Sequence, residues 1–337
     1  MIVEMKTGAS REEVDAVVEK AKSFDLDVQL NLGTDKVVVA ILGSNTGQLD
    51  TGIFAVLPGV ESVTRIMKQY KLASREFKPQ GSRVKCGDVE IGGDRVVVIA
   101  GPCAVESETQ LMEAAQSVKK AGASVLRGGA FKPRTSPFSF QGLQKSGLEL
   151  LAKVKEEVKM PIVTEVVEPN NVKLVADYAD LLQIGSRNMQ NYALLSAAGR
   201  SKRPVVLKRG FSCTITEWLT AADYLLAEDN DVILCERGIR TFEDSVRFSM
   251  DISSIPVLKK SSHLPVIVDP SHAAGHYSLV PAIAKAAIAA GADGLLIEVH
   301  PNPKEALVDG LQSLSLSDFT RLMGELKVVA KAVGRYI

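Results

Sequence analysis

Residues 95–127 read RVVVIAGPCAVESETQLMEAAQSVKKAGASVLR, and this stretch contains the unit that decides the fold. It begins with a run of β-branched residues without alternating polar positions, as is typical of a strand buried on both faces. A helical stretch follows, for which Ser107 is a candidate N-cap, Gln110 its capping-box partner and Gly122 a candidate end. The stretch closes with a second short strand, SVLR, so it predicts a strand–helix–strand unit.

The same alternation of strand and helix continues along the rest of the chain. Eight short apolar strands are predicted, at residues 95–100, 124–127, 161–165, 181–185, 204–208, 231–235, 265–269 and 294–298. Eight such units within about 250 residues predict a (β/α)8 TIM barrel. A doubly wound open sheet is the alternative, and the count of eight favours the barrel. The segment KCGDVEIGGDRV, which leads into the first strand, predicts an extra hairpin that closes the N-terminal end of the barrel.

Residues 1–70 follow a different pattern. IVEM and VESVTRI are strand-like, and REEVDAVVEKAKSF has apolar residues at helical spacing. Two further strands, DVQLNL and KVVVAIL, flank a predicted hairpin turn at Gly33-Thr34-Asp35, and a short helix is predicted over 49–56. The order βαββαβ predicts a ferredoxin-like α+β domain. We therefore expect three parts: a ferredoxin-like domain at 1–70, a polar linker at 71–85 and the barrel at 86–337.

The composition limits the classes of partner. The 337 residues include 40 Lys and Arg and 40 Asp and Glu, so the formal net charge is zero. Without an overall basic field, neither nucleic acid nor a membrane surface is an expected partner. The stretch MIVEMKTGAS lacks the apolar core of a signal peptide, and no uninterrupted apolar run reaches the roughly 18 residues of a membrane span. We therefore expect a cytoplasmic protein.

Reactive side chains follow the predicted barrel strands. In a TIM barrel the carboxyl ends of the strands meet at one face, where active sites are found. A surface salt bridge explains any one of these side chains, but it does not explain the whole set. We therefore expect a single site built from these strand-end residues: Cys103, Arg127, Glu165, Arg187, Lys208, Arg209, Glu236, Arg237, Asp269, His272, Glu298 and His300.

The loop after the second predicted strand reads GGAFKPRTSP, at residues 128–137. Glycine permits close backbone approach and proline stiffens the chain, so this loop is expected to hold Lys132 and Arg134 in fixed positions. Arginine matches carboxylate and phosphate groups with a planar fork, and lysine offers a point charge. These two residues add to four strand-end cations, and the set predicts ligands with several negative charges, such as two phosphorylated molecules: Arg127, Arg187, Lys208 and Arg237.

Metal binding is a second chemistry predicted at the same face. Cys103, His272 and Glu298 lie at three strand ends, and Asp309 follows the last strand closely enough to be a fourth ligand. One sulfur, one imidazole and two carboxylates suit several divalent ions. The spacing is a weak signal, because in isolation a core cysteine and a hydrogen-bonded loop histidine are the better explanations. No two cysteines lie close in the sequence, so free thiols or a metal ligand are expected rather than disulfides.

Seven segments in order carry a family resemblance: GPCAVES, LRGGAFKPRTSP, QIGSRNMQN, LKRGF, CERGIRTF, VDPSHAAG and EVHPNP. Over residues 85–335 the chain resembles the 3-deoxy-D-arabino-heptulosonate 7-phosphate (DAHP) synthases. The resemblance implies an enzyme that condenses phosphoenolpyruvate with erythrose 4-phosphate at the entrance to the shikimate pathway. Residues 1–70 resemble the regulatory domain of the short, feedback-inhibited branch of that family, mostly in pattern and position.

The resemblance implies a role for each predicted site residue. The expected ligands of one divalent metal ion are Cys103, His272, Glu298 and Asp309. The expected phosphoenolpyruvate site consists of Arg127, Lys132, Arg187, Lys208 and Arg237. The phosphate of erythrose 4-phosphate is expected to contact Arg134, Thr135 and Ser136.

Four residues are expected to take part in the reaction itself: Lys132, Glu165, Cys103 and His272. We expect Lys132 to be the acid that protonates an oxygen, because it lies between the two anion sites. Glu165, or a water on the metal, is expected to activate the attacking water. A structural role for Glu165, as the partner of a nearby arginine, is an equal alternative.

Two other functions compete with this one. The sister enzyme that makes 3-deoxy-D-manno-octulosonate 8-phosphate from arabinose 5-phosphate shares the barrel and most of the anion site. Its loop reads Lys-Ala-Asn-Arg, as the resemblance implies, whereas only Pro133 separates Lys132 from Arg134 here, which favours the four-carbon sugar. A non-catalytic metabolite sensor is the other alternative, and the retention of Lys132 and of every expected metal ligand argues against it.

The N-terminal domain is expected to regulate the enzyme. Its expected ligand is an aromatic amino acid, tyrosine or phenylalanine, bound between subunits of a homo-oligomer, for which we expect a homotetramer. A purely stabilising or assembly role is the alternative. The sequence leaves open the native metal among Mn, Fe, Zn and Co, the identity of the amino acid, and a dimer against a tetramer.

Overall fold

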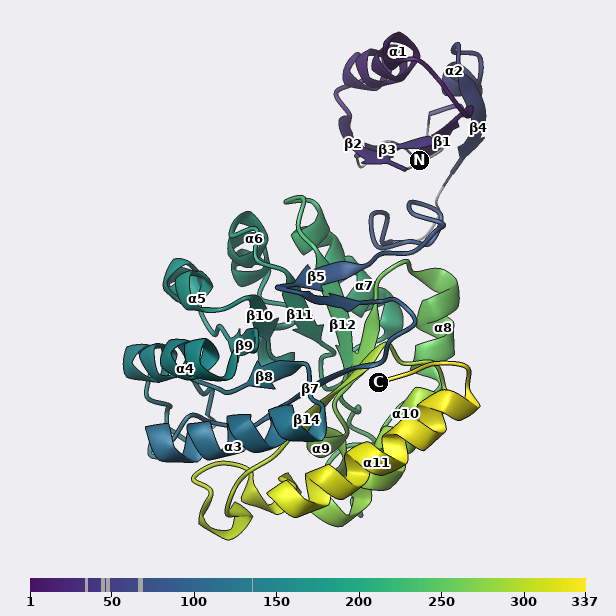
Figure 1. Ribbon diagram of the computed structural model, residues 1–337. Helices are drawn as coiled ribbons and strands as arrows, with labels where there is room; N and C mark the ends of the chain where they lie inside the picture. The colour runs from purple at the N-terminus through teal and green to yellow at the C-terminus, as the bar shows by residue number, and fades with distance from the viewer. Residues whose placement is uncertain (34–35, 44–45, 47–48, 66–68, 135) are drawn as a thin grey trace. The chain divides into compact units, whose positions relative to one another are not determined.

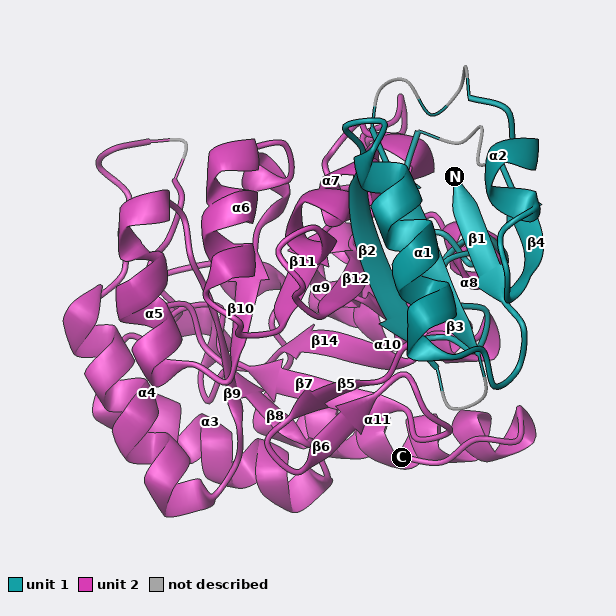
Figure 2. Cartoon of the chain, turned by 90° about the horizontal axis from the view of Figure 1, so that it is seen from above, with its two compact units in different colours: residues 1–81, 260–263 teal, residues 82–259, 264–337 magenta. Residues whose placement is uncertain are grey.

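The computed structural model describes residues 1–33, 36–43, 46, 49–65, 69–134 and 136–337. The chain forms two compact units, which Figure 2 shows in different colours. Unit 1 consists of residues 1–81 with 260–263, and unit 2 of residues 82–259 with 264–337. The division after Gly81 lies within the segment predicted as a linker, whereas nothing in the sequence predicts that Lys260–His263 belongs to unit 1.

Unit 1 has the predicted ferredoxin-like fold. The sheet is antiparallel with strand order β2-β3-β1-β4, so the predicted βαββαβ arrangement is confirmed. The Ser10 hydroxyl caps the first helix by accepting a hydrogen bond from the Glu13 N–H, and the Glu13 carboxylate accepts one from the Ser10 N–H in return. Thr34 and Asp35 of the predicted hairpin turn lie outside the described residues. The elements in order are β1 (Ile2–Met5), α1 (Arg11–Lys22), β2 (Asp27–Leu32), β3 (Val37–Leu42), α2 (Gly52–Ala55) and β4 (Val60–Thr64).

The segment after β4 joins residues 260–263 inside unit 1. The Ser262 hydroxyl donates a 2.6 Å hydrogen bond to the Ala73 carbonyl, and His263 Nε2 lies 2.7 Å from the Leu72 carbonyl oxygen. Burial lowers the pKa of His263 to about 4, so this side chain is neutral at physiological pH.

Unit 2 is built around a closed barrel of eight parallel strands, which Figure 1 shows surrounded by helices. The last strand pairs with the first, with Gly294 opposite Val97 and Glu298 opposite Gly101, so the sheet has no open edge. The predicted TIM barrel is therefore confirmed and the open-sheet alternative is excluded. The strands are β7 (Val97–Gly101), β8 (Val125–Arg127), β9 (Ile162–Glu165), β10 (Leu181–Ile184), β11 (Val205–Lys208), β12 (Val232–Glu236), β13 (Val266–Val268) and β14 (Gly294–Glu298).

Helices connect successive barrel strands. The longer ones are α3 (Glu108–Ala121), α4 (Lys145–Val158), α5 (Val172–Tyr178), α6 (Tyr192–Arg200), α7 (Ile215–Leu226), α8 (Ser254–Ser261), α10 (Val280–Ala289) and α11 (Leu316–Ala332). Short helical turns lie close to the strand ends: η2 (Pro169–Asn171), η3 (Ser186–Asn188), α9 (Pro270–Ala274), η4 (Tyr277–Leu279), η5 (Pro303–Glu305) and η6 (Gly310–Gln312). No helix of the described residues is long and apolar enough to cross a membrane.

The ends of α3 agree only in part with the sequence prediction. Ser107 accepts a hydrogen bond from the Gln110 N–H, and Gly122 ends the helix in the left-handed region at a φ of 106°. The predicted capping box is wrong, because the Gln110 amide accepts from the Glu106 N–H and donates to the Ala104 carbonyl instead. Gln110 therefore ties the helix to the loop after β7.

A two-stranded hairpin, β5 (Val84–Cys86) and β6 (Val89–Ile91), precedes the barrel. Its buried side chains form one apolar cluster with residues at the beginning of barrel strands, including Val97, Val125 and Leu181. The hairpin therefore closes the N-terminal end of the barrel, as predicted, and leaves the other end for a site.

Candidate active site

A cavity of about 270 Å³ lies at the carboxyl ends of the barrel strands. Ten of the predicted site residues line it: Arg127, Lys132, Arg134, Ser136, Glu165, Arg187, Lys208, Arg237, His272 and Asp309. All six predicted cations thus face one space, as the barrel topology requires of strand-end residues. Thr135, the remaining predicted contact of the sugar phosphate, lies outside the described residues.

The four predicted metal ligands meet beside this cavity. One donor atom from each of Cys103, His272, Glu298 and Asp309 lies within 4.8 Å of the others. Cys103 Sγ is 3.4 Å from Asp309 Oδ2, and His272 Nε2 is 3.4 Å from Glu298 Oε1. A sulfur, an imidazole nitrogen and two carboxylate oxygens form a donor set that suits divalent transition metals.

The electrostatics of this cluster fit a bound cation. Glu298 Oε1 is buried and accepts no hydrogen bond from the described residues, although Arg127 Nη1 lies 3.0 Å away. Burial, with the neighbouring charge of Glu298, raises the pKa of the Cys103 thiol. A divalent ion would reverse that shift, because metals bind the thiolate and displace the proton. The residues present therefore fit a metal ion.

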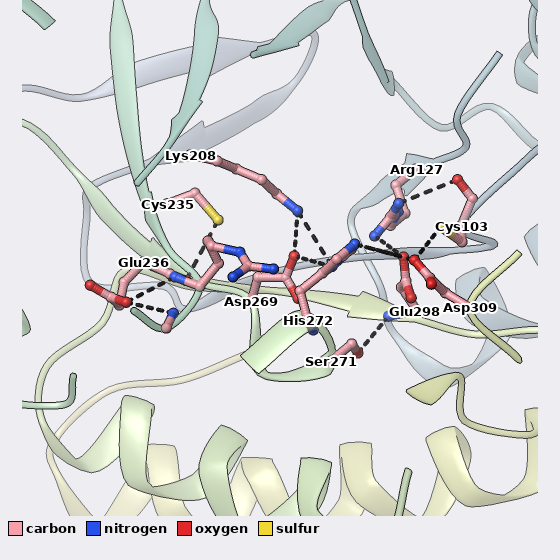
Figure 3. A network of polar contacts seen from close by, with 12 residues as sticks. Cys103, Arg127, Lys208, Cys235, Glu236, Asp269, Ser271, His272, Glu298 and Asp309 are labelled. Carbon is pink, nitrogen blue, oxygen red and sulfur yellow. Dashed lines mark hydrogen bonds and ion pairs between the residues drawn. The ribbon is translucent and has the colours of Figure 1, made fainter. Parts of the chain in front are cut away.

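His272 is oriented by a second carboxylate, as Figure 3 shows. Its Nδ1 lies 2.7 Å from Asp269 Oδ2, and Lys208 Nζ donates to the same carboxylate oxygen. Although burial raises it, the charge of Lys208 and the hydrogen bond from His272 hold the pKa of Asp269 well below its usual range. Burial lowers the pKa of His272, which favours the neutral imidazole that binds metals. With Nδ1 directed to Asp269, Nε2 points into the ligand cluster.

Lys132 joins the metal-ligand cluster to the anion cavity. Its ammonium donates to the Cys103 carbonyl oxygen at 3.1 Å and to Cys103 Sγ at 3.2 Å. Burial opposes its charge, but the charges of Cys103 and Glu165 raise the pKa of Lys132 above its usual value. Lys132 is therefore protonated at physiological pH, and its charge opposes the rise in the pKa of the Cys103 thiol.

Arg237 lies against two aromatic rings. Its guanidinium carbon lies 3.9 Å from the centre of the Phe248 ring and 5.0 Å from that of Phe211, and the two rings are stacked at 5.1 Å. Burial lowers the pKa of Arg237 to about 10, so the side chain remains charged at neutral pH. Its Nη1 is buried and has no hydrogen-bond partner among the described residues. An anion bound in the cavity would supply such a partner.

Glu165 is buried, with its carboxylate against the backbone of β10 and the loop that follows. A Cβ at Gly185 would come within 2.1 Å of Glu165 Oε1, so a side chain at 185 would displace this carboxylate from its position. Among the described residues no ion pair joins Glu165 to an arginine. The carboxylate therefore faces the cavity beside Arg127 and Gln183.

Comparison with known proteins agrees with this geometry. A family model described as "DAHP synthetase I family" matches residues 80–333, and one described as "DAHP synthase ferredoxin-like domain" matches residues 1–68. The chain belongs to the DAHP synthetase I family.

Two relatives differ in their sequence identity to the chain and in the share of it that they match. The chain is 48% identical, over 99% of both chains, to the phospho-2-dehydro-3-deoxyheptonate aldolase of Thermotoga maritima. It is 33% identical to a 2-dehydro-3-deoxyphosphooctonate aldolase of Geotalea uraniireducens, over 73% of this chain and 97% of that protein. The second relative therefore matches a smaller part of the chain at lower identity.

Solved structures agree with the fold of this DAHP synthetase I family member. A crystal structure of the Thermotoga maritima DAHP synthase matches with a TM-score of 0.79 at 47% identity, over 99% of this chain and 98% of that one. A truncated form of the same enzyme matches with a TM-score of 0.75 at 46% identity, over 80% of this chain and 99% of that one.

Three of the predicted strand-end residues belong neither to the cavity lining nor to the neighbouring cluster around His272. Glu236 is fully buried and accepts hydrogen bonds from the N–H groups of Arg237 and Gly238, while Arg209 pairs with it at 2.7 Å. His300 Nε2 lies 3.4 Å from a carboxylate oxygen of Glu106. The expectation that all strand-end residues share one site is therefore wrong for Arg209, Glu236 and His300, whose polar atoms are occupied by neighbouring loops.

Several cavity residues were not predicted from the sequence. Gln183 lies within β10, where an apolar run conceals it, and Phe211 follows the cations of the LKRGF motif. Arg247 lies in the long segment between β12 and α8, away from any strand end. The sequence offers one signal for such residues, which is a position close to a predicted cation. Phe211 has this signal, because it lies two residues after Arg209, and Arg247 does not.

Proposed function

We propose that this chain catalyses the condensation of phosphoenolpyruvate, erythrose 4-phosphate and water to DAHP and phosphate, the first step of the shikimate pathway. The observation that carries the proposal is the single cavity in which six cations face the ligand cluster of Cys103, His272, Glu298 and Asp309. Membership of the DAHP synthetase I family and the 48% identity to the Thermotoga maritima enzyme support the same reaction.

The proposed cofactor is one divalent metal ion, Mn, Fe, Zn or Co, held by the four clustered side chains. A metal supplies Lewis-acid polarisation of the aldehyde oxygen of the sugar. Lys132 and Arg127 balance the negative charge of the ligands, since Lys132 Nζ is 3.2 Å from Cys103 Sγ and Arg127 Nη1 is 3.0 Å from Glu298 Oε1. The charges of these two residues therefore favour the deprotonated ligands that a metal needs.

The cations divide between the two proposed substrates. Phosphoenolpyruvate is assigned to Arg127, Lys132, Arg187, Lys208 and Arg237, and the phosphate of erythrose 4-phosphate to Arg134, Thr135 and Ser136. The unpartnered Nη1 of Arg237 supports the first assignment, because a phosphate oxygen would satisfy it. Two anions repel each other in water, and a cationic cavity removes that barrier while fixing their attack geometry.

The reaction then requires the formation of one carbon–carbon bond, the addition of one water and the loss of phosphate. C3 of phosphoenolpyruvate attacks the aldehyde carbon, and the aldehyde oxygen takes up a proton. C2 is left electron-poor and accepts a water oxygen, and the water loses one proton. The C2–O bond to phosphate then breaks, phosphate leaves with the bonding electrons, and the C2 hydroxyl passes its proton to the departing phosphate as the ketone forms.

Lys132 is proposed as the proton donor to the aldehyde oxygen, and Glu165 as the base that accepts a proton from the attacking water. The raised pKa of Lys132 supports the first role, because the residue enters the reaction protonated. The position of the Glu165 carboxylate on the cavity wall supports the second. A Lys132→Met variant that kept a near-normal kcat would contradict the donor role.

The decisive experiment follows phosphoenolpyruvate consumption after chelation and after addition of Mn²⁺, Zn²⁺ or Fe²⁺. It is run with erythrose 4-phosphate and, in parallel, with arabinose 5-phosphate. We expect metal-restored turnover with the four-carbon sugar alone, consistent with the single Pro133 between Lys132 and Arg134. Turnover of arabinose 5-phosphate would favour the sister enzyme, and activity that ignores chelation would overturn the metal site.

Unit 1 is proposed to be a feedback domain that binds tyrosine or phenylalanine within a homotetramer. The match of residues 1–68 to the DAHP synthase ferredoxin-like domain supports this proposal. Truncation before Ser82 should leave an active enzyme that aromatic amino acids no longer inhibit. Because His263 and Ser262 are hydrogen-bonded to Leu72 and Ala73, the truncated chain should also be less stable near residue 263. A truncated enzyme that is still inhibited would contradict the regulatory role.

A further inference from the structure

The two carboxylates of the ligand cluster are each held at one oxygen and open at the other. Asp309 Oδ2 faces the cluster, 3.4 Å from Cys103 Sγ and 3.8 Å from His272 Nε2. Asp309 Oδ1 faces away from it and lies 3.4 Å from Arg247 Nη1. The arginine therefore occupies the outer oxygen of this carboxylate.

Glu298 repeats this arrangement through an intermediate side chain. Its Oε1 faces His272 Nε2 at 3.4 Å, while its Oε2 accepts a 2.6 Å hydrogen bond from Gln312 Nε2. The amide oxygen of Gln312 in turn accepts a 2.7 Å hydrogen bond from Arg247 Nη1. One guanidinium thus reaches the outer oxygens of both carboxylates, directly for Asp309 and through Gln312 for Glu298.

Asp309 needs such support because no strand holds it. Cys103 and Glu298 follow or end β-strands and His272 lies on α9, but Asp309 precedes the short turn η6. Its backbone adopts the left-handed region at a φ of 54°, which is unusual for a residue with a side chain. The position of its carboxylate therefore depends on contacts from elsewhere in the fold.

Arg247 is itself fixed by the element that carries His272. Its N–H donates a 3.3 Å hydrogen bond to the carbonyl of Ala274, the last residue of α9. Gly275, at a φ of 72°, ends that helix, and a Cβ there would lie 2.5 Å from Arg247 Cβ. The backbone of Arg247 is therefore tied to one metal ligand and its side chain to two others.

We propose that Arg247 and Gln312 are positioning residues of the metal centre, which hold the outer oxygens of Asp309 and Glu298 so that each carboxylate presents one oxygen to a divalent ion. The inference rests on the proposed metal site. Partners of this kind fix the orientation of a ligand, and their loss typically weakens metal binding about 10- to 100-fold. Because one guanidinium serves both carboxylates, the two residues act as a unit.

A simpler role for Arg247 is a seventh substrate cation, since its side chain is 36% exposed and lines the cavity. The two roles differ when no substrate is present. A substrate cation changes a KM and leaves metal affinity unchanged, whereas a positioning residue changes metal affinity in the protein alone.

The test titrates the metal-free, full-length protein with Co²⁺ against a chromophoric chelator and records the visible absorption of the bound ion. We expect Arg247→Met and Gln312→Leu each to weaken Co²⁺ binding about 10- to 100-fold and to alter the absorption. The double variant should be little weaker than the worse single one, because both changes break the same link. Arg240→Met is the matched control, because Arg240 lies on the same segment, is exposed and, among the described residues, forms no hydrogen bond or ion pair with the four proposed metal ligands. The Co²⁺ affinity of this variant should stay within about twofold of that of the unchanged protein.

Each outcome is decisive. Wild-type Co²⁺ affinity and spectrum in a folded Arg247→Met protein overturn the inference, and a raised KM in that protein identifies a substrate cation. If Arg247→Met does not fold, Gln312→Leu decides, because it breaks the link while keeping every charge. If the unchanged protein itself binds no Co²⁺, the proposed metal site fails, which this titration separates from failure of the positioning role.

Discussion

The two ends of the barrel bury side chains in opposite ways. At the N-terminal end, the β5–β6 hairpin packs apolar side chains such as Val84 and Ile91 into the barrel. Asp293, buried at the same end, accepts hydrogen bonds from the Val266 N–H and the Lys259 ammonium. At the carboxyl end, Arg237 is equally buried, yet its Nη1 has no hydrogen-bond partner among the described residues. Buried polar groups that are hydrogen-bonded within the protein contribute to its stability. A buried polar group without such a partner can instead form a hydrogen bond with a ligand.

Two buried cysteines illustrate the same contrast. Burial raises the pKa of Cys86, in the hairpin, to about 12, and it also raises the pKa of Cys103. Cys86 lies among apolar side chains, whereas Cys103 has the ammonium of Lys132 at 3.2 Å and the carboxylate of Asp309 at 3.4 Å. Burial alone does not separate a structural thiol from a ligand, but the neighbouring charges do.

The largest expected effect comes from exchanging sulfur for oxygen at each end. Cys103→Ser removes the soft metal ligand and should lower kcat/KM by about 10³-fold or more, since the metal contributes several kcal/mol of transition-state stabilisation. Cys86→Ser buries a hydroxyl in an apolar cluster and should cost about 1–3 kcal/mol of stability. Steady-state kinetics and thermal unfolding of both variants separate the effects. A Cys86→Ser enzyme that folds but loses activity would contradict the division of roles.

Asp293→Ala should have the next largest effect, and on stability alone. The substitution leaves the Val266 N–H without its acceptor and Lys259 without its carboxylate, and breaking a buried pair in this way costs about 3 kcal/mol. KM values should not change, because Asp293 immediately precedes β14, at the opposite end from the cavity. Unfolding in denaturant measures the first effect and kinetics the second; a changed KM would mean that the two ends are coupled.

Arg237→Met should give the reverse result. Losing the guanidinium should weaken phosphoenolpyruvate binding about 100-fold, as expected when a buried charge partner is removed. Stability should stay the same or rise, because a guanidinium whose charge is disfavoured by burial is replaced by an apolar side chain. Equilibrium binding and the unfolding midpoint test both parts. A loss of stability as large as that of Asp293→Ala would show that Arg237 has a structural role.

The sequence predicted the barrel strands better than it predicted the contacts around the cavity at their carboxyl ends. Runs such as VVVIA and VVLK are buried on both faces, so each barrel strand leaves a local signal in its own residues. The proposed ligands Cys103 and Glu298 could be predicted because they follow or end such runs.

Residues that act through distant segments left no local signal. The proposed role of Arg247 depends on its contacts with Asp309 and Gln312. These residues lie more than 60 positions later in the sequence, and the closed barrel brings them next to Arg247. For the same reason, nothing local indicates that residues 260–263 join unit 1, since their hydrogen bonds are to Leu72 and Ala73. Strand ends are therefore predictable from sequence, whereas contacts between loops depend on tertiary structure.

The smallest expected effect on substrate binding comes from replacing an apolar side chain at the carboxyl end of the barrel. Phe248 contributes a ring face to Arg237 at 3.9 Å, whereas the hairpin residue Ile91 contributes only apolar volume. Phe248→Leu keeps an apolar side chain and removes the ring, so it should weaken phosphoenolpyruvate binding about 3- to 10-fold, the value of one cation–π contact. Phe242→Leu is the matched control, because Phe242 lies on the same segment and is fully exposed.

Phe248→Trp should restore most of the lost affinity, since the indole ring again offers a π face to the guanidinium. Ile91→Val, a similar trimming at the hairpin, should cost about 1 kcal/mol of stability and leave binding unchanged. Isothermal titration and thermal unfolding of these variants compare the two ends directly. If Phe248→Leu lowered stability without changing affinity, its ring would be packing as Ile91 does. Apolar side chains would then have the same role at both ends, and the contrast would rest on the charged residues alone.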